Sequence, residues 1–223
     1  VYDDVNDSIL YKVYENGVWT SETYTLYNSS SGNVKGLTAA MMPDGTTGIV
    51  YTLDYGTDDD AFDCETILAV IDNKNKVIAD IRLTNNDSAD LNPQIAVADF
   101  GGEEGSKFVV GWYNVKKDGI TDIKFVAADS LGNISNEFID SISSINENSA
   151  VIITDSFKFA KKNNLSIDGF TIVWVEPTLE FDDTINKNAE NDCLKAVKFM
   201  RDSSGRIYLT APLDVATMSS FTL

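Results

Sequence analysis

The sequence predicts an all-β fold built from repeated units, and three observations carry this prediction. Short segments alternate apolar with polar residues, which is the period of a strand with one buried face. Gly, Asn and Asp separate these segments, and they supply the positive φ angles that tight turns need. Tyr51, Trp112 and Trp174 stand in similar apolar segments at intervals of about 60 residues, a period typical of solenoids, propellers and arrays.

The repeat is clearest in two strands predicted at Gln94–Asp99 and Lys107–Tyr113. A turn rich in Gly and Glu joins them, and the second strand is apolar up to Trp112. The same order recurs in Leu37–Asp54, which contains Tyr51, and in Phe157–Pro177, which contains Trp174. Because the aromatic residue recurs at equivalent positions, we expect Trp112 and Trp174 to lie in the core.

A predicted β-hairpin opens each unit, with an acidic residue before its first strand. The opening strands are Asp7–Tyr14, Asp63–Val70, Asp122–Val126 and Asp192–Phe199. The turns are Glu15–Gly17, Asp72–Asn75, Asp129–Asn133 and Asp202–Gly205. The second strands are Val18–Leu26, Val77–Leu83, Ile134–Asp140 and Ile207–Leu213. Polar links rich in Ser and Asn then connect each hairpin to the strand pair described above.

The units span about residues 7–62, 63–121, 122–191 and 192–223. A complete unit has four strands, which suits one blade of a β-propeller. The fourth unit has its hairpin and then only Asp214–Leu223. Since a closed ring needs about four to eight blades, we expect a β-propeller or part of one, with about three complete four-stranded blades plus a partial fourth, inside a larger protein. The alternative is an open, stacked β-array in which neighbouring units bury each other's faces.

One motif order runs through the units. It reads Pro, an alternating strand, a Gly-rich turn, an apolar strand ending in Trp, Asp-Ile, and an Asp-x-x-Gly hairpin. The residues that carry it are Pro93, Trp112, Asp122, Ile123, Asp129 and Gly132, and more loosely Pro43, Gly45, Tyr51, Asp54, Asp72 and Trp174. This pattern resembles the blades of bacterial extracellular β-propellers of the WD40-like and TolB-like group, over nearly the whole chain but without the WD dipeptide. The resemblance implies a scaffold that docks partners and sometimes binds glycans.

The chain is acidic, with 17 basic and 35 acidic residues and a net charge of −18. This charge argues against nucleic acid and against anionic membrane surfaces as partners. No apolar run approaches the ~20 residues that span a bilayer. The absence of histidine from the sequence excludes Ser-His-Asp and Cys-His catalysis within this chain. Because the chain does not begin with Met, we expect a mature product or a piece of a longer protein.

Clusters of acidic residues before the opening strands are candidates for calcium, which prefers oxygen ligands. The preferred candidate is the loop with Asp58, Asp59, Asp60 and Asp63. Further clusters lie at Asp3–Asp7, Glu180–Asp183 and Asn85–Asn92. None matches the EF-hand pattern, and solvated surface loops are the alternative interpretation.

Cys64 and Cys193 occupy equivalent places in units two and four. Two blades of separation exceeds the ~7 Å over which two Cα atoms can be bridged, so we expect no disulfide between them.

The favoured function is a non-catalytic binding or structural module of a larger secreted or cell-surface bacterial protein, which presents loops to a glycan or protein partner. Aromatic residues crowd the first unit, at Tyr2, Tyr11, Tyr14, Trp19, Tyr24 and Tyr27. The period of the strands places about half of them in the core, and the exposed ones can stack on sugars or anchor a protein. The alternative is a fragment of a carboxylate-based glycoside hydrolase, in which Asp99, Asp155 and Asp168 are the acids of most interest. A purely architectural spacer is a third possibility.

Overall fold

The computed structural model describes residues 2–3, 8–28, 32–56, 61–99, 105–119, 121–145, 151–154, 169–182, 187–201, 207–209 and 213–219, with side chains described between residues 8 and 135. The described residues form β-strands and one short 3₁₀ helix, η1 (Ala61–Asp63). The predicted all-β class is therefore confirmed.

The strands form several antiparallel sheets. The first sheet has the order β1 (Tyr2–Asp3), β2 (Ser8–Tyr11), β5 (Tyr24–Tyr27), and a separate hairpin pairs β3 (Tyr14–Glu15) with β4 (Val18–Trp19). The second sheet is β6 (Asn33–Met41), β7 (Thr47–Asp54), β8 (Cys64–Ile71), β9 (Val77–Arg82). The third sheet is β10 (Ala89–Asp99), β11 (Ser106–Val115), β12 (Thr121–Ala128), β13 (Ile134–Ile145). The fourth sheet is β14 (Val151–Thr154), β15 (Gly169–Asp182), β16 (Lys187–Arg201), β17 (Ile207–Leu209), and β18 (Leu213–Ser219) also pairs with β16.

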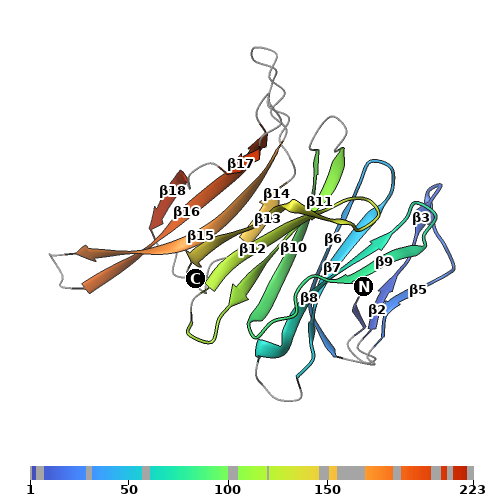
Figure 1. Ribbon diagram of the computed structural model, residues 1–223, viewed down its shortest axis with the longest axis horizontal. Coiled ribbons are helices and arrows are strands. Elements are labelled where there is room, and N and C mark those ends of the chain that lie inside the picture. Colours follow the sequence, from blue (N-terminus) through green and yellow to red (C-terminus); the bar gives the residue numbers. More distant parts are fainter. Residues whose placement is uncertain are drawn as a thin grey trace, which may run out of the picture.

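The sheets follow one another in chain order, from blue at the right of Figure 1 to orange at the left. Neighbouring sheets are in contact, since β10 touches β6, β7 and β8 of the second sheet and also β14 of the fourth. The described sheets do not close into a ring. The structure therefore shows a series of antiparallel sheets, and the propeller stays a prediction.

The boundaries of the second and third sheets are shifted by two strands from those of the predicted sequence units. The second sheet joins the last two strands of the first unit to the opening hairpin of the second unit, and the third sheet does the same one unit later. Short turns hold antiparallel neighbours in one sheet, whereas the longer polar links, such as Thr84–Ser88, cross to the next sheet.

The predicted turns form where their residues allow positive φ. Asn16 and Gly17 have φ angles of 51° and 84° in the β3–β4 turn. In the β8–β9 turn, Asp72 Oδ1 accepts hydrogen bonds from the backbone N–H groups of Lys74 and Lys76, both at 2.9 Å. Asp129 repeats this arrangement in the β12–β13 turn, with Leu131 and Asn133 as the donors. Three of the four predicted turns are therefore confirmed, and Asp202–Gly205 lies outside the described residues.

The central strands of the second sheet are buried on both faces. Its β7 and β8 are almost entirely buried, so alternate residues serve two different cores. Tyr51 and Ile67 pack towards Ile9 of the first sheet. Val50, Leu68 and Val70 pack against the third sheet, where their partners include Phe108, Val110 and Trp112. Trp112 is 5% exposed, as predicted for a core residue. The side chain of Trp174 lies outside the described part.

Candidate functional site

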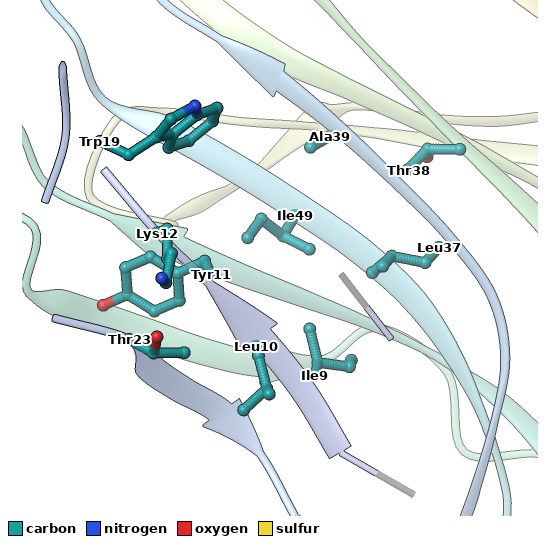
Figure 2. Close-up of a pocket in the computed structure, with 10 residues that line it drawn as sticks. All are labelled: Ile9, Leu10, Tyr11, Lys12, Trp19, Thr23, Leu37, Thr38, Ala39 and Ile49. Atoms are coloured by element: carbon teal, nitrogen blue, oxygen red, sulfur yellow. The ribbon is translucent and has the colours of Figure 1, made fainter. Parts of the chain in front are cut away.

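An open apolar pocket lies between the first and second sheets, with a volume of about 970 Å³. Figure 2 shows the residues that line it, which come from β2, β4, β6 and β7 and from the segments beside them. They are Ile9, Leu10, Tyr11, Lys12, Trp19, Thr23, Leu37, Thr38, Ala39 and Ile49. A pocket of this size with aliphatic walls and few polar groups is typical of a binding site.

Strand alternation explains which side chains form the wall. Leu37 pairs with Tyr51 and Ala39 pairs with Ile49, so these residues share the face of the second sheet that is turned to the first. Leu37 packs on the same core cluster as Ile49 and Ile9. Ala39 is exposed, whereas Ile49 is buried at the floor.

Aromatic side chains border the pocket. Trp19 is 66% exposed, and its ring meets that of Tyr14 edge-on at a centroid distance of 5.1 Å. Tyr11 stacks on Tyr24 at 5.0 Å. The Tyr11 hydroxyl donates a 2.9 Å hydrogen bond to the backbone oxygen of Asn75, which ties the pocket wall to the β8–β9 turn. Tyr11 is therefore fixed to the second sheet.

Acidic groups surround these tyrosines. Burial raises the pKa of Tyr11, and the carboxylates of Asp72 and Glu22 raise it further. The Tyr24 hydroxyl donates a 2.8 Å hydrogen bond to Glu22, which raises the pKa of Tyr24. Lys12 is the cation among the described residues of the lining.

A second cluster of polar side chains lies at the junction of the second and third sheets, around the buried carboxylates of Glu65 and Asp90. Asp90 Oδ1 accepts hydrogen bonds from Trp112 Nε1 at 2.8 Å and from Asn114 Nδ2 at 2.7 Å. Its Oδ2 accepts a 2.8 Å hydrogen bond from Asn86 Nδ2. Burial raises the pKa of Asp90, these amide donors oppose the rise, and the nearby charge of Glu65 adds to it.

Glu65 is held in the same way. Glu65 Oε1 accepts hydrogen bonds from Arg82 Nη2 at 2.9 Å and from the backbone N–H of Asn86 at 3.0 Å. Glu65 Oε2 accepts a hydrogen bond from the Thr84 hydroxyl. Thr84 and Asn86 belong to the link that crosses from β9 to β10. Because every described contact of the two carboxylates anchors this link or an adjacent strand, we assign them a structural role.

The predicted calcium residues are only partly described. Asp63 ends η1 and is exposed, whereas Asp58, Asp59 and Asp60 lie outside the described residues. No group of three or more potential ligands is present in the described part of the chain. Within the predicted cluster Asn85–Asn92, the Asp90 carboxylate is occupied by hydrogen bonds. Calcium stays a prediction.

The cysteines and the other acids are also placed in part. Cys64 is a free, buried thiol on β8, and burial raises its pKa to about 11. The side chain of Cys193 is outside the described residues. Asp99 ends β10, and Asp155 and Asp168 lie in segments that the structure does not describe.

The sequence pattern alone does not single out Glu65 or the aliphatic wall of the pocket. One signal did point to Glu65. It is the second residue of β8, and another acid, Asp122, is the second residue of β12. Both are buried, and both pair with a cation, Arg82 for Glu65 and Lys116 for Asp122. The wall had no such signal, since strands distant in sequence build it.

Comparisons of the chain with protein-family models, with curated proteins and with solved structures give no match. Among the described residues, no helix has the length and apolar character needed to span a membrane.

Proposed function

We propose that this chain is a non-catalytic binding module of a larger secreted or cell-surface protein, and that it binds a protein or glycan partner at the pocket between the first and second sheets. The open apolar pocket of about 970 Å³ carries this proposal. Monomeric proteins rarely leave a large apolar surface open without a binding role. The exposed Trp19 at its border is the residue type most often dominant in binding energy.

The lining favours a protein partner over a glycan. Ile9, Leu37 and Ile49 present methyl groups, which suit aliphatic side chains better than the hydroxyls of a sugar. Trp19 and Tyr14 offer the aromatic faces on which a sugar ring can stack. The glycoside-hydrolase alternative gains no support from Glu65 and Asp90, because hydrogen bonds occupy both carboxylates.

The propeller belongs to the same proposal. Its support is the repetition of four-stranded sheets that bury each other's faces, as in the second and third sheets. In this arrangement the partner site lies between two neighbouring blades.

The test is a binding screen of the full chain against a glycan array and a peptide-display library. The best ligand is then measured with the wild type, Trp19→Ala and Leu131→Ala. Leu131 is 65% exposed on the β12–β13 turn and serves as the matched control. We expect Trp19→Ala to weaken binding at least about tenfold and Leu131→Ala to leave it unchanged. Absence of any ligand in both screens, or equal effects of the two variants, would contradict the proposal.

A further inference from the structure

The turn of the β3–β4 hairpin is Asn16-Gly17, the one Asn-Gly pair in the sequence. Asn-Gly is a preferred pair for a two-residue hairpin turn, and the two residues have φ angles of 51° and 84°. It is also the pair in which an asparagine side chain reacts most readily with the main chain, because glycine has no side chain to shield its own backbone nitrogen. The contacts of the turn decide whether this reaction is open to the folded chain.

The two reacting groups of the turn are exposed to solvent. Residues 14–19 are all exposed, and a Cβ atom built on Gly17 would meet nothing within 4 Å. Among the described contacts, neither the Asn16 carboxamide nor the Gly17 N–H group takes part in a hydrogen bond. The hairpin consists of two residue pairs, and a hairpin of that size opens locally at low cost. The backbone nitrogen of Gly17 is therefore free to reach the side chain of Asn16.

The Asp44-Gly45 pair in the β6–β7 turn shows the opposite arrangement. An Asp-Gly pair can react in the same way, through the nitrogen of the glycine and the side-chain carbon of the acid. Here the Gly45 N–H donates a 3.0 Å hydrogen bond to the backbone oxygen of Met42. Asp44 Oδ1 accepts a 2.9 Å hydrogen bond from the backbone N–H of Thr46. Because both groups are held in place, the fold protects Asp44 and leaves Asn16 reactive.

We propose that Asn16 is a site of spontaneous modification, at which the turn converts to isoaspartate and releases ammonia. The backbone nitrogen of Gly17 gives its proton to solvent and forms a bond to Asn16 Cγ. The bond from Cγ to Nδ2 breaks, and the amide nitrogen takes up a proton and leaves as ammonia. Water then opens the cyclic imide. Addition of water at the main-chain carbonyl carbon leaves the chain running through Cγ, which is isoaspartate, and addition at Cγ gives ordinary aspartate.

The product changes the hairpin, because isoaspartate adds a methylene group to the main chain. The lengthened turn cannot keep both Glu15 opposite Val18 and Tyr14 opposite Trp19. A new carboxylate also appears beside Glu15, and the two negative charges repel each other. We therefore expect the edge-on contact of the Tyr14 and Trp19 rings to be lost. Since Trp19 borders the pocket, the modification alters that border, but the reaction itself does not depend on the proposed function.

The test is incubation of the full chain at neutral and at mildly alkaline pH, followed by tryptic digestion and tandem mass spectrometry. The tryptic peptide of residues 13–35 contains Asn28 and Asn33 as internal controls. We expect isoaspartate to form at position 16 at least about tenfold faster than at either control. The rate should rise with pH, because the attacking nitrogen must lose its proton. An intact Asn16, or earlier modification of a control, would overturn the proposal.

The same digestion measures the protection given by the fold. In urea, isoaspartate should appear at position 44 as well as at position 16, whereas in the folded chain it should appear at position 16 alone of these two. Formation of isoaspartate at both positions in the folded chain would show that the hydrogen bonds of Asp44 and Gly45 do not decide reactivity. That result would overturn the structural part of the argument.

The effect on the hairpin is measured by NMR of the indole N–H groups. The Trp19 signal is assigned by its loss in Trp19→Phe, and we expect it to shift as isoaspartate accumulates. It should stay unchanged in Asn16→Gln, because the longer side chain closes a ring far more slowly. The Trp112 indole, which donates to Asp90, is the control that should not move. An unchanged Trp19 signal in the modified chain would overturn the effect on the pocket border.

Discussion

At the scale of single residues, Asp90 forms hydrogen bonds to both the second and the third sheet. Its carboxylate accepts hydrogen bonds from Asn86, Trp112 and Asn114, and its backbone oxygen accepts one from Thr52 of β7 at 3.2 Å. Asp90→Ala would leave the buried donors of Trp112 and Asn114 without an acceptor, and we expect a loss of about 3 kcal/mol in the free energy of unfolding. Asp90→Asn keeps an acceptor oxygen, and we expect a loss below about 1 kcal/mol. Urea melts followed by tryptophan fluorescence measure both, and equal losses would refute the assignment.

The same residue predicts a pH dependence. Because burial raises the pKa of Asp90 above its ordinary 3.8, the folded state binds this proton more tightly than the unfolded state. The contribution of the protonated carboxyl to stability is therefore full below about 3.8 and is lost as pH rises through the raised pKa. We expect the stability of the wild type relative to Asp90→Asn to fall as pH rises above about 3.8. A difference that is constant or rises with pH would contradict this sign.

At the scale of elements, the β12–β13 turn packs against β9 as well as connecting its two strands. Gly132 has a φ of 86°, and a Cβ atom there would lie 2.7 Å from the Cβ atom of Ala79 on β9. Gly119 has a similar φ of 83° with nothing within 4 Å. Gly119→Ala should therefore cost about 1 kcal/mol from backbone strain alone. Gly132→Ala should cost a further 1–3 kcal/mol or so from overpacking. Thermal unfolding of both variants gives the difference, and equal costs would show that the turn does not pack on β9.

The polar link between β9 and β10 is the other connecting element with a defined role. Thr84 accepts a 2.9 Å hydrogen bond from the backbone N–H of Thr66, and Leu83 N–H donates to the oxygen of Thr66 at 2.8 Å. Together with the contacts of Asn86, these bonds continue the pairing along β8 past the end of β9. These hydrogen bonds therefore fix the conformation of the link where it crosses from the second sheet to the third.

At the scale of the whole molecule, the shared faces of the second sheet predict cooperative unfolding. Removal of the first sheet would expose Tyr51, and removal of the third would expose Val50 and Leu68, so the three sheets stabilise one another. We expect a single urea transition with coincident circular dichroism and tryptophan fluorescence. Separate transitions by the two probes would show that the sheets unfold independently.

Calcium is tested on the same chain. If the loop with Asp58, Asp59, Asp60 and Asp63 binds the ion, calcium raises the urea midpoint relative to EDTA at constant slope. Asp63→Asn should then reduce the rise, while Asp129→Asn, in a turn whose carboxylate already accepts backbone hydrogen bonds, lowers stability equally in both solutions. A midpoint that calcium does not change would leave the loop as solvated surface.

The sequence by itself determined the features that depend on neighbouring residues. The alternation of apolar and polar residues predicted most strands. The turns were predicted from their residue types, and Asn16 and Gly17 indeed have positive φ, while Asp72 and Asp129 accept backbone hydrogen bonds. The recurrence of an aromatic residue identified Trp112 as core. These signals are local, because alternation and turn chemistry act within a few residues of the chain.

Only the tertiary structure decided which strands share a sheet, where Glu65 and Asp90 meet, and that Leu37 and Ala39 face an open pocket. The alternation of β6 predicts a buried face, but whether that face is covered depends on the strands of the sheet before it. In the sequence, Glu65 and Asp90 look like ordinary acids near strand ends. In the fold, the crossing link places Asn86 between them, where it donates a hydrogen bond to each carboxylate. Sheet pairing and sheet stacking join segments tens of residues apart, and the free energy of those contacts does not appear in the local pattern of either segment.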